Sequence, residues 1–349
     1  MQVNISLKKV IDNSYDITID TIPELSYDTK VAIVTNPKVA GLHLSYLLSK
    51  IRAKELYIIT VPDGENYKNQ GSIDLILESL FNHRFNRKSL LIAFGGGVIG
   101  DMTGYASSIY QRGIDFVQIP TTLLSQVDAS VGGKTGINNS YGKNLIGAFH
   151  QPRAVYIDPY FLETLPKREF GAGVAEVVKM AVTFNKDFFA YLEEADLSDK
   201  TLLQEAIKQA VETKAGVVAK DEKEHGLRAA LNYGHTFGHV IENETAYKKY
   251  LHGEAVAIGM VMANALSVKL GLMKEEEALR IQKLLEKYKL PTSYTIENVE
   301  RFYEAFFLDK KSSDASITFI LPVGIGGVKI TDSVDKDTVL AVLETFGKE

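Results

Sequence analysis

The sequence predicts a chain of two halves, an α/β half with a parallel sheet followed by a helical half. In the first half, short apolar runs rich in β-branched residues alternate with helical patterns, as in chains built from βαβ units. After Pro166 the apolar residues recur at helical spacing. The 349 residues also exceed what one hydrophobic core usually serves. We therefore expect two domains, residues 1–165 and residues 166–349.

Five apolar runs in the first half have the length and the β-branched content of buried parallel strands. Helical patterns at residues 39–51 and 72–85 lie between them, which favours right-handed crossovers and a doubly wound, Rossmann-like sheet. An antiparallel hairpin of residues 3–8 and 15–19 would precede this sheet. The five strands are expected at residues 31–35, 56–61, 90–94, 116–120 and 154–158.

The second half is predicted to be all-α apart from one late hairpin, residues 317–321 and 327–330, with Pro322 and Gly324 in its turn. No internal repeat or low-complexity linker separates the halves, so we expect them to pack closely with a cleft between them. The helices are expected at residues 173–183, 187–195, 200–220, 228–243, 254–270, 275–289 and 299–308, and from residue 336.

Composition excludes several classes of protein. The net charge of −5 provides no basic field for nucleic acid, so we expect no nucleic-acid partner. The chain has no cysteine, which excludes disulfides, thiolate ligands and a cysteine nucleophile. The first ten residues lack the pattern of a signal peptide, and the most apolar stretch, residues 255–272, is interrupted by Asn264, Ser267 and Lys269. We expect a soluble cytoplasmic protein with no membrane partner.

One stretch of the second half is rich in histidine. It reads NYGHTFGHVIENETAYKKYLHGE over residues 232–254 and holds three of the seven histidines. His235 and His239 are four apart and Glu242 is three further on, so all three project from one face of a helix. His252 then begins a second apolar helix.

These residue types indicate a metal-binding domain. A divalent ion needs neutral imidazoles and a carboxylate from elements that converge in space, and Glu176, in FGAGVAEVVKMA, is the best further ligand by type. The alternative is that the histidines are core or cap residues, which is the usual role of a lone pair at this spacing. Three histidines beside glycines, which let backbones approach closely, favour a site; the glycines are Gly234, Gly238 and Gly253.

A glycine-rich turn in the first half suits a dinucleotide. The strand ending at Phe94 runs into GGGVIGD and then a helix, so backbone amides and the helix N-terminus would meet a pyrophosphate. The spacing is not GxGxxG and the turn follows the third strand, so a tight structural turn is an equal alternative. The segment from Pro62 to Lys68 follows another strand end at the same edge and would hold adenosine hydroxyls.

Two glycine–lysine segments follow that turn. Gly133 with Lys134, and Gly142 with Lys143 and Asn144, place ammonium groups on flexible backbone, which suits an anion or a substrate facing a nicotinamide. A solvated lysine turn is the alternative for either segment alone. The GxxxxGK[ST] spacing is absent, so a kinase or ATPase is not indicated.

Taken in order over residues 62–311, the motifs resemble those of the 3-dehydroquinate synthase family. The resemblance rests on GGGVIGD, QRGIDFVQIPTTLLSQVDASVGGKTGIN, GKNLIGAFHQP, GVAEVVKMA, LNYGHTFGHVIE and LHGEAVAIGM. It implies a homodimeric, metal- and NAD-dependent cyclase that converts the sugar phosphate 3-deoxy-D-arabino-heptulosonate 7-phosphate into 3-dehydroquinate and phosphate in the shikimate pathway.

The resemblance also implies roles for individual residues. A zinc or cobalt ion would bind Glu176, His235 and His252, with His239 next to the ion and not a ligand. The substrate carboxylate and hydroxyls would meet Asp128, Lys134, Asn144, Lys179, Arg228 and Asn232. The phosphate would meet Lys134, Asn144, His239 and, from the partner subunit, Arg112, while Lys214 and one of Lys310 and Lys311 fit the remaining basic positions. NAD would contact Asp63, Glu65, Lys68, Gly96, Gly97, Asp101, Thr121, Thr122, Lys143 and Thr164.

Three other functions fit parts of the pattern. A metal-dependent polyol or alcohol dehydrogenase would share the cofactor turn but would not need the cations Lys134, Lys143, Lys179, Lys214 and Arg228. A sibling cyclase that makes an inosose or a valiolone acts on a substrate without a carboxylate, so Lys214 and Arg228 favour dehydroquinate. A non-catalytic NAD-binding protein would not need the set of metal ligands.

Overall fold

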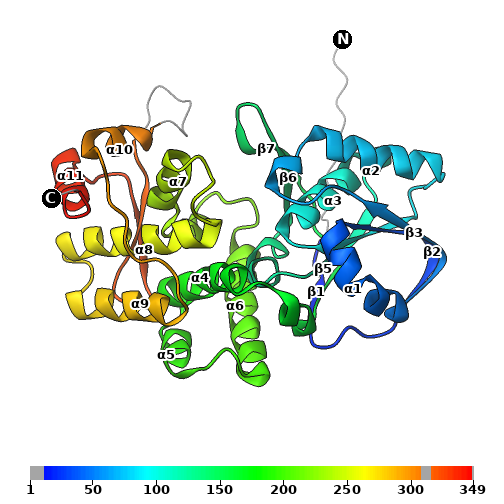
Figure 1. Cartoon of the computed structure of the whole chain (residues 1–349), viewed down its shortest axis with the longest axis horizontal. Helices are drawn as coiled ribbons and strands as arrows, with labels where there is room; N and C mark the ends of the chain where they lie inside the picture. Colours follow the sequence, from blue (N-terminus) through cyan, green and yellow to red (C-terminus); the bar gives the residue numbers. More distant parts are fainter. Residues whose placement is uncertain (1–11, 308–315, 348–349) are drawn as a thin grey trace, which may run out of the picture.

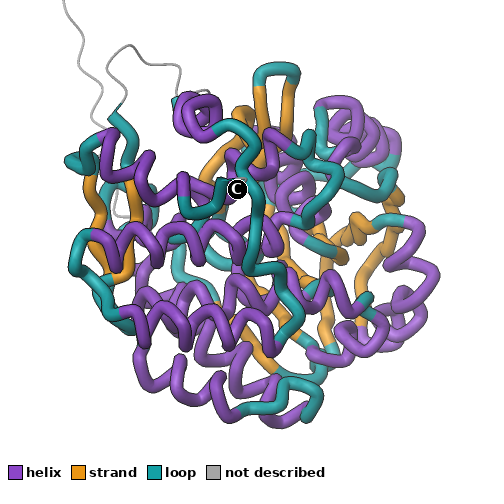
Figure 2. Tube along the Cα trace, turned by 60° about the vertical axis from the view of Figure 1, so that its left-hand side comes forward, coloured by secondary structure: helices purple, strands orange, loops and turns teal. Residues whose placement is uncertain are grey.

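The computed structural model describes residues 12–307 and 316–347. It has two parts side by side: a sheet flanked by helices, and a group of helices that contains the C-terminal helix α11 (Lys336–Glu344) (Figure 1). Seen as a tube, helices lie on both sides of the view, and one short pair of strands near the left margin is separate from the other strands (Figure 2). This arrangement agrees with the predicted α/β half followed by a helical half.

Six of the described strands of the first part form one parallel sheet. Its order is β1-β8-β5-β4-β2-β3, and all its pairings are parallel. The five predicted parallel strands are confirmed. The bounds are β1 Asp16–Ile19, β2 Leu25–Thr35, β3 Ile51–Thr60, β4 Leu90–Gly95, β5 Asp115–Pro120 and β8 Ala154–Ile157.

Helices cover both faces of this sheet because its central strands are apolar on both faces. Val31 and Ile33 of β2 pack in one cluster with Leu47 of α1 (Pro37–Lys50). The alternate residues Ala32 and Val34 pack in another cluster, with α2 (Gln70–Asn82) and α3 (Gly97–Ile109). The sheet is therefore doubly wound.

The predicted N-terminal hairpin is only partly testable. Residues 3–8 lie outside the described residues, but residues 16–19 do form a strand. That strand pairs in parallel with β8, Asp16 opposite Ala154, so it extends the main sheet. A hairpin that the strand pattern did not predict lies further along: β6 (Lys134–Asn139) pairs antiparallel with β7 (Gly142–Phe149). This hairpin carries the two glycine–lysine segments.

The second part is helical, as predicted, with one small hairpin. That hairpin pairs β9 (Phe319–Pro322) antiparallel with β10 (Val328–Thr331). None of the helices in the described residues is both long and apolar enough to cross a membrane. The helices are α4 Lys167–Phe184, α5 Lys186–Glu194, α6 Lys200–Lys220, α7 His235–Glu244, α8 His252–Lys269, α9 Glu275–Lys287, α10 Val299–Ala305 and α11.

One predicted helix was too long. Residues 228–243 do not form a continuous helix: a short 3-10 helix, Leu227–Asn232, is followed by a break, and α7 begins at His235. Gly234 at the break has φ +81°, and a Cβ there would lie 2.8 Å from the carbonyl oxygen of Val256. A side chain is excluded on both counts, so the break brings α7 close to α8.

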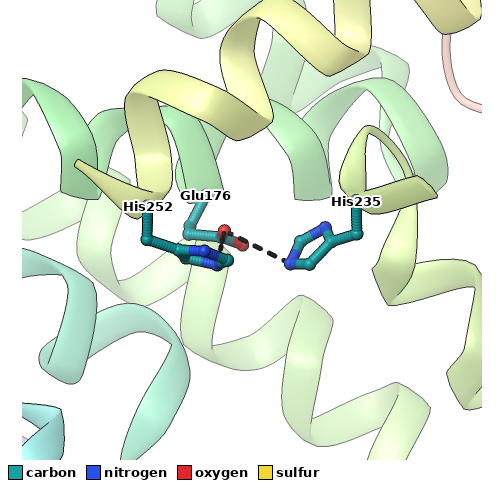
Figure 3. A group of neighbouring side chains, drawn as sticks. All are labelled: Glu176, His235 and His252. Atoms are coloured by element: carbon teal, nitrogen blue, oxygen red, sulfur yellow. Dashed lines mark ion pairs between the residues drawn. The ribbon is translucent and has the colours of Figure 1, made fainter. Parts of the chain in front are cut away.

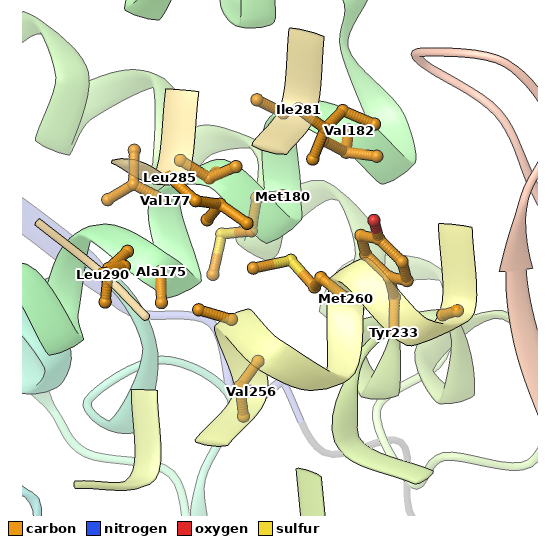
Figure 4. Packing of buried hydrophobic residues seen from close by; sticks show 14 of the residues in the cluster. Ala175, Val177, Met180, Val182, Tyr233, Val256, Met260, Ile281, Leu285 and Leu290 are labelled. Atoms are coloured by element: carbon orange, nitrogen blue, oxygen red, sulfur yellow. The ribbon is translucent and has the colours of Figure 1, made fainter. Parts of the chain in front are cut away.

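The core of the second part surrounds α8. Its apolar residues meet Met180 of α4 and Ile281 and Leu285 of α9 (Figure 4). Val256 and Met260 of α8 are fully buried there. A helix that is apolar on all sides belongs at the centre of a domain, and this one holds its first residue, His252, in a fixed place.

Candidate metal centre and the charges around it

Three helices bring Glu176, His235 and His252 together. Glu176 lies in the middle of α4, His235 is the first residue of α7, and His252 is the first residue of α8. One possible ligand atom from each lies within 4.8 Å of those of the others. Figure 3 shows both imidazoles directed at the carboxylate.

Glycine contacts set the distance between these helices. A Cβ at Gly253 would lie 2.0 Å from the carbonyl oxygen of Ala172, so α8 rests directly on the backbone of α4. A Cβ at Gly259 would lie 2.0 Å from the carbonyl oxygen of Gly234. Since no other residue fits at either place, these two glycines allow the three helix segments to converge.

Both imidazoles present Nε2 to Glu176. The Nδ1 of His235 lies 3.2 Å from the carbonyl oxygen of Tyr233, which can only accept a hydrogen bond. The Nδ1 of His252 lies 3.3 Å from Oε1 of Glu242. These contacts favour the tautomer with the proton on Nδ1, which leaves the lone pair of each Nε2 free for a ligand bond.

The spacing and the burial suit a shared cation. Oε1 of Glu176 is 3.9 Å from Nε2 of His235 and 3.8 Å from Nε2 of His252, too far for hydrogen bonds. Glu176 is fully buried, and its oxygens have no hydrogen-bond partner in the described residues, although Oε2 forms an ion pair with Lys179. A buried carboxylate beside two free imidazole nitrogens fits a divalent ion bound by nitrogen and oxygen ligands.

The protonation of the two histidines is also relevant to metal binding. Burial, together with the charge of Lys179, lowers the pKa of His235 well below its usual value, so its ring is neutral near pH 7. Burial also opposes the charged form of His252, but the hydrogen bond and charge of Glu242 outweigh burial and raise the pKa of His252. A bound cation would favour the neutral form of that ring too.

Buried cations lie near the metal cluster, where Lys179 forms an ion pair with Glu176. Lys179 and Arg228 are each 2% exposed. Charged side chains are rarely buried so fully, so these two indicate a site that binds an anionic group. Nζ of Lys214 donates to the carbonyl oxygen and to Oδ1 of Asp128, at 2.6 and 2.7 Å. Burial opposes ionisation of Asp128, but Lys214 and Lys179 outweigh it and hold the pKa of that carboxyl well below its usual range.

A second charged group links the two parts. Lys134 of β6 forms an ion pair with Glu224, whose other oxygen accepts a hydrogen bond from Nδ2 of Asn232 at 3.1 Å. Arg228 donates to the carbonyl oxygen of Gly132 at 3.1 Å. The cations predicted to meet the substrate therefore lie where the glycine–lysine segments of the first part face α6 and α7.

The residues predicted to bind NAD lie at the carboxyl ends of the strands. Gly96 begins α3, and a Cβ there would lie 3.2 Å from Cγ2 of Thr122. A Cβ at Gly97 would lie 3.3 Å from Cβ of Ala129. The hydroxyl of Thr121 is buried without a hydrogen-bond partner among the described residues. The turn therefore offers backbone without side chains at Gly96 and Gly97, and the Thr121 hydroxyl has no partner in the described part of the chain. The turn lies at the carboxyl ends of the strands, where dinucleotides bind in such sheets.

Polar contacts link the other predicted NAD residues. Nζ of Lys68, 4% exposed, lies 2.5 Å from both Oδ2 of Asp101 and Oδ1 of Asn144. Burial raises the pKa of Asp101. The remaining contacts are Asp63 accepting from Asn36 at 2.7 Å, Glu65 accepting from Asn138 at 2.7 Å, and Oγ1 of Thr164 at 2.7 Å from Nε2 of His43.

The remaining predicted site residues are neither metal ligands in this cluster nor part of the predicted NAD site. Arg112 precedes β5, so it lies at the edge where the strands begin, opposite the edge with the glycine turn. The ring of His239 lies 5.4 Å from that of His235 and 6.3 Å from that of His252, measured between centroids. Lys310 and Lys311 lie outside the described residues.

Two acidic residues of the site were not assigned a role from the sequence. Glu224 contacts Lys134 and Asn232 from a charged loop after α6 that carries no motif of its own. Glu242 shares a helical face with His235, as the spacing predicted, yet it contacts His252 and Lys143. The spacing showed which way Glu242 projects but not what it meets.

Comparison with known proteins agrees with this geometry. A model of the 3-dehydroquinate synthase N-terminal region matches residues 58–172, and a model of the C-terminal region matches residues 173–312. The chain is 74% identical over 349 residues to the 3-dehydroquinate synthase of Sulfurimonas denitrificans, covering 100% of each.

Solved structures of related cyclases share the fold. A 2-epi-5-epi-valiolone synthase from Streptomyces hygroscopicus with NAD+ and Zn2+ bound has a TM-score of 0.87 and 27% identity, covering 99% of each chain. A 2-deoxy-scyllo-inosose synthase complexed with carbaglucose-6-phosphate, NAD+ and Co2+ has a TM-score of 0.79 and 25% identity, covering 91% of each chain. With its whole length matched, this chain belongs to the 3-dehydroquinate synthase family.

Proposed function

We propose that this chain converts 3-deoxy-D-arabino-heptulosonate 7-phosphate into 3-dehydroquinate and phosphate, as a phosphate-eliminating carbon–oxygen lyase. The observation that carries the proposal is the combination of the Glu176–His235–His252 cluster with the buried cations Lys179 and Arg228. Full-length identity to proteins named 3-dehydroquinate synthase supports the same activity.

The cofactors we propose are NAD and a zinc or cobalt ion. Related cyclases hold NAD+ with Zn2+ or Co2+, and this chain has both a bare glycine turn and a cluster of nitrogen and oxygen ligands. When bound, NAD would take and return a hydride, and the ion would polarise the oxygen on the carbon being oxidised. Glu176, His235 and His252 would hold the ion, and the turn at Gly96 and Gly97 would hold the pyrophosphate.

The chain's own residues supply position and charge. Lys179, Lys214 and Arg228, all buried, would hold the substrate's carboxylate and hydroxyls in position. The phosphate would meet Lys134, Asn144 and His239. Because the new ketone acidifies the neighbouring C–H bond, the substrate's own phosphate can take that proton and leave. The substrate then recovers its hydride, opens its ring and closes again as a carbocycle.

We propose that the enzyme works as a homodimer, with the partner subunit's Arg112 at the phosphate. Arg112 of the same subunit is at the far edge of the sheet, which is compatible with service to a partner. We further propose domains of residues 1–165 and 166–349, and action in the cytoplasm, where NAD is available. The net charge of −5 supports a small-molecule substrate without a nucleic-acid partner.

The cations argue against the dehydrogenase alternative. A neutral alcohol carries neither carboxylate nor phosphate, so it would offer no anionic group for the buried cations Lys179, Lys214 and Arg228 to bind. The substrate of a sibling cyclase has no carboxylate, so it would leave Lys214 and Arg228 without the group that they would bind. A non-catalytic NAD-binding protein would not need the metal ligands.

One assay tests the proposal. The chain, the heptulosonate phosphate, zinc and NAD at a concentration far below that of the substrate should yield dehydroquinate and free phosphate in equal amounts over many turnovers. No net NADH should remain, because the hydride returns to the product. NADH accumulating in step with consumed substrate would reject the synthase and support the dehydrogenase.

A further inference from the structure

Glu242 is a buried carboxylate with two partners from different elements. Its side chain is 5% exposed on α7, seven residues after His235. Oε1 lies 3.3 Å from Nδ1 of His252, at the start of α8. The same Oε1 lies 3.5 Å from Nζ of Lys143, on β7 of the sheet part. One oxygen atom thus joins the metal cluster to the hairpin that faces it.

Its position relative to the cluster indicates orientation, not ligation. Glu242 contacts Nδ1 of the His252 ring, whereas the other ring nitrogen, Nε2, lies 3.8 Å from Oε1 of Glu176. Figure 3 shows this ring beside the carboxylate of Glu176. The side chain of His252 is 36% exposed, so packing alone does not fix its ring. An acceptor at Nδ1 would set both the rotation of the ring and its tautomer.

Lys143, the hairpin residue in this contact, also contacts an aromatic ring. Nζ of Lys143 lies 3.8 Å from the centroid of the Tyr247 ring, just beyond the end of α7. Lys143 is therefore placed between an aromatic face and a buried carboxylate. Since β7 belongs to the sheet part and Glu242 to the helical part, a movement of the hairpin would change the charge that Glu242 faces.

We propose that Glu242 is a positioning residue that orients His252 for the metal ion and couples the β6–β7 hairpin to the metal centre. The inference rests on the metal centre of the proposed function. A carboxylate behind a metal-bound imidazole typically changes metal affinity about 10- to 100-fold when it is removed. The role can therefore be measured without turnover.

The test is titration of metal-free chain with Co2+. The dissociation constant is obtained by competition with a chelator, and the visible absorption bands report the geometry around the ion. Glu242→Ala should weaken Co2+ binding about 10- to 100-fold and alter the bands. Glu242→Gln keeps an acceptor oxygen without the charge, so its affinity should fall between those of wild type and Glu242→Ala.

Glu244→Gln is the matched control. It removes the same charge from the same helix at an exposed position, where Glu244 accepts a hydrogen bond from Tyr294. It should bind Co2+ like wild type, with the same bands. Wild-type affinity and bands in Glu242→Ala would overturn the positioning role alone. Failure of the wild-type chain itself to bind Co2+ would instead overturn the metal centre, and this inference with it.

A double-mutant cycle tests the link to the hairpin. Lys143→Met and Glu242→Gln should change Co2+ affinity non-additively, because Lys143 would act on the ion through Glu242. Additivity within about twofold would overturn the coupling while leaving the orientation of His252 in place.

Discussion

At the scale of single residues, the sequence spacing predicted which way the side chains of α7 project but not which residues they contact. The i, i+4, i+7 pattern placed His235, His239 and Glu242 on one face, yet the atoms that meet are those of Glu176, His235 and His252. The reason is that α4 and α8 approach the start of α7 through Gly253 and Gly259, and such packing is not written in the pattern of one helix. The family resemblance, which carries information about the packed fold, named this trio.

The metal cluster yields a prediction for four single variants. Ala at Glu176, His235 or His252 should remove the metal and the activity together, because each loses one of three converging ligands. His239→Ala should keep the ion and lose activity, since its ring is beside the cluster and outside it. Elemental analysis of purified protein measures the metal. Stoichiometric metal in all three ligand variants would show that the ion is bound elsewhere.

At the scale of elements, the parallel strands were predictable because each is a short apolar run that stands out from its neighbours, as Leu90–Gly95 does. The β6–β7 hairpin was not, because its strands are rich in glycine and polar residues and were interpreted as flexible turns. The helix expected at 228–243 was too long because Gly234 is tolerated inside a helical pattern, while its φ of +81° is set by contact with α8.

The contact of α8 with α4 can be tested at Gly253. Gly253→Ala would force a Cβ to within 2.0 Å of the carbonyl oxygen of Ala172, so it should lower the free energy of unfolding by about 1–3 kcal/mol and reduce metal content. Gly216→Ala, in α6 with nothing within 4 Å, is the control and should raise stability by about 0.5–1 kcal/mol. Denaturant unfolding measures both. Equal stability of the two variants would disprove the close contact.

The loop after α6 makes a prediction about pH. The carboxylate of Asp221 accepts backbone N–H bonds from His225, Gly226 and Arg228, with the bond from Arg228 foremost, and these lower its pKa to about 2. A depressed carboxyl pKa stabilises the fold above the unfolded value, and the stabilisation is lost as the pH falls through the folded value. Asp221→Ala should therefore be less stable than wild type near pH 7, with the difference shrinking as the pH falls towards 2. A difference that persists unchanged at pH 2 would mean that the side chain acts in some other way.

At the scale of the whole molecule, the candidate site takes residues from both parts. Lys134 and Lys143 on the hairpin of the sheet part pair with Glu224 and Glu242 of the helical part. The sequence predicted two closely packed halves, but it could not show which charges would meet across them, because these pairs are about 90 residues or more apart and depend on the folded arrangement. Under the proposed function, both parts are needed together.

The order of chemical steps can be tested on the intact enzyme. Oxidation must precede loss of phosphate, because only the ketone makes the adjacent proton acidic enough to leave. A substrate analogue whose phosphate is replaced by a non-leaving phosphonate should therefore stall with bound NADH, visible by its absorbance. The natural substrate should show no such accumulation. Release of phosphate from the natural substrate in the complete absence of NAD would contradict this order.

The shared site of the proposed dimer makes the last prediction. Arg112→Ala and Lys179→Ala should each be inactive: Lys179 is buried beside Glu176, while Arg112, at the opposite edge of the sheet, would act in the partner subunit. In a twofold dimer, each site then takes Lys179 from one chain and Arg112 from the other. A heterodimer of the two variants has one site with both lesions and one site with neither. After subunit exchange in an equal mixture, half of the dimers are heterodimers, so activity should return to about a quarter of the wild-type level. Exchange shown by mass spectrometry without any return of activity would place Arg112 outside the partner's site.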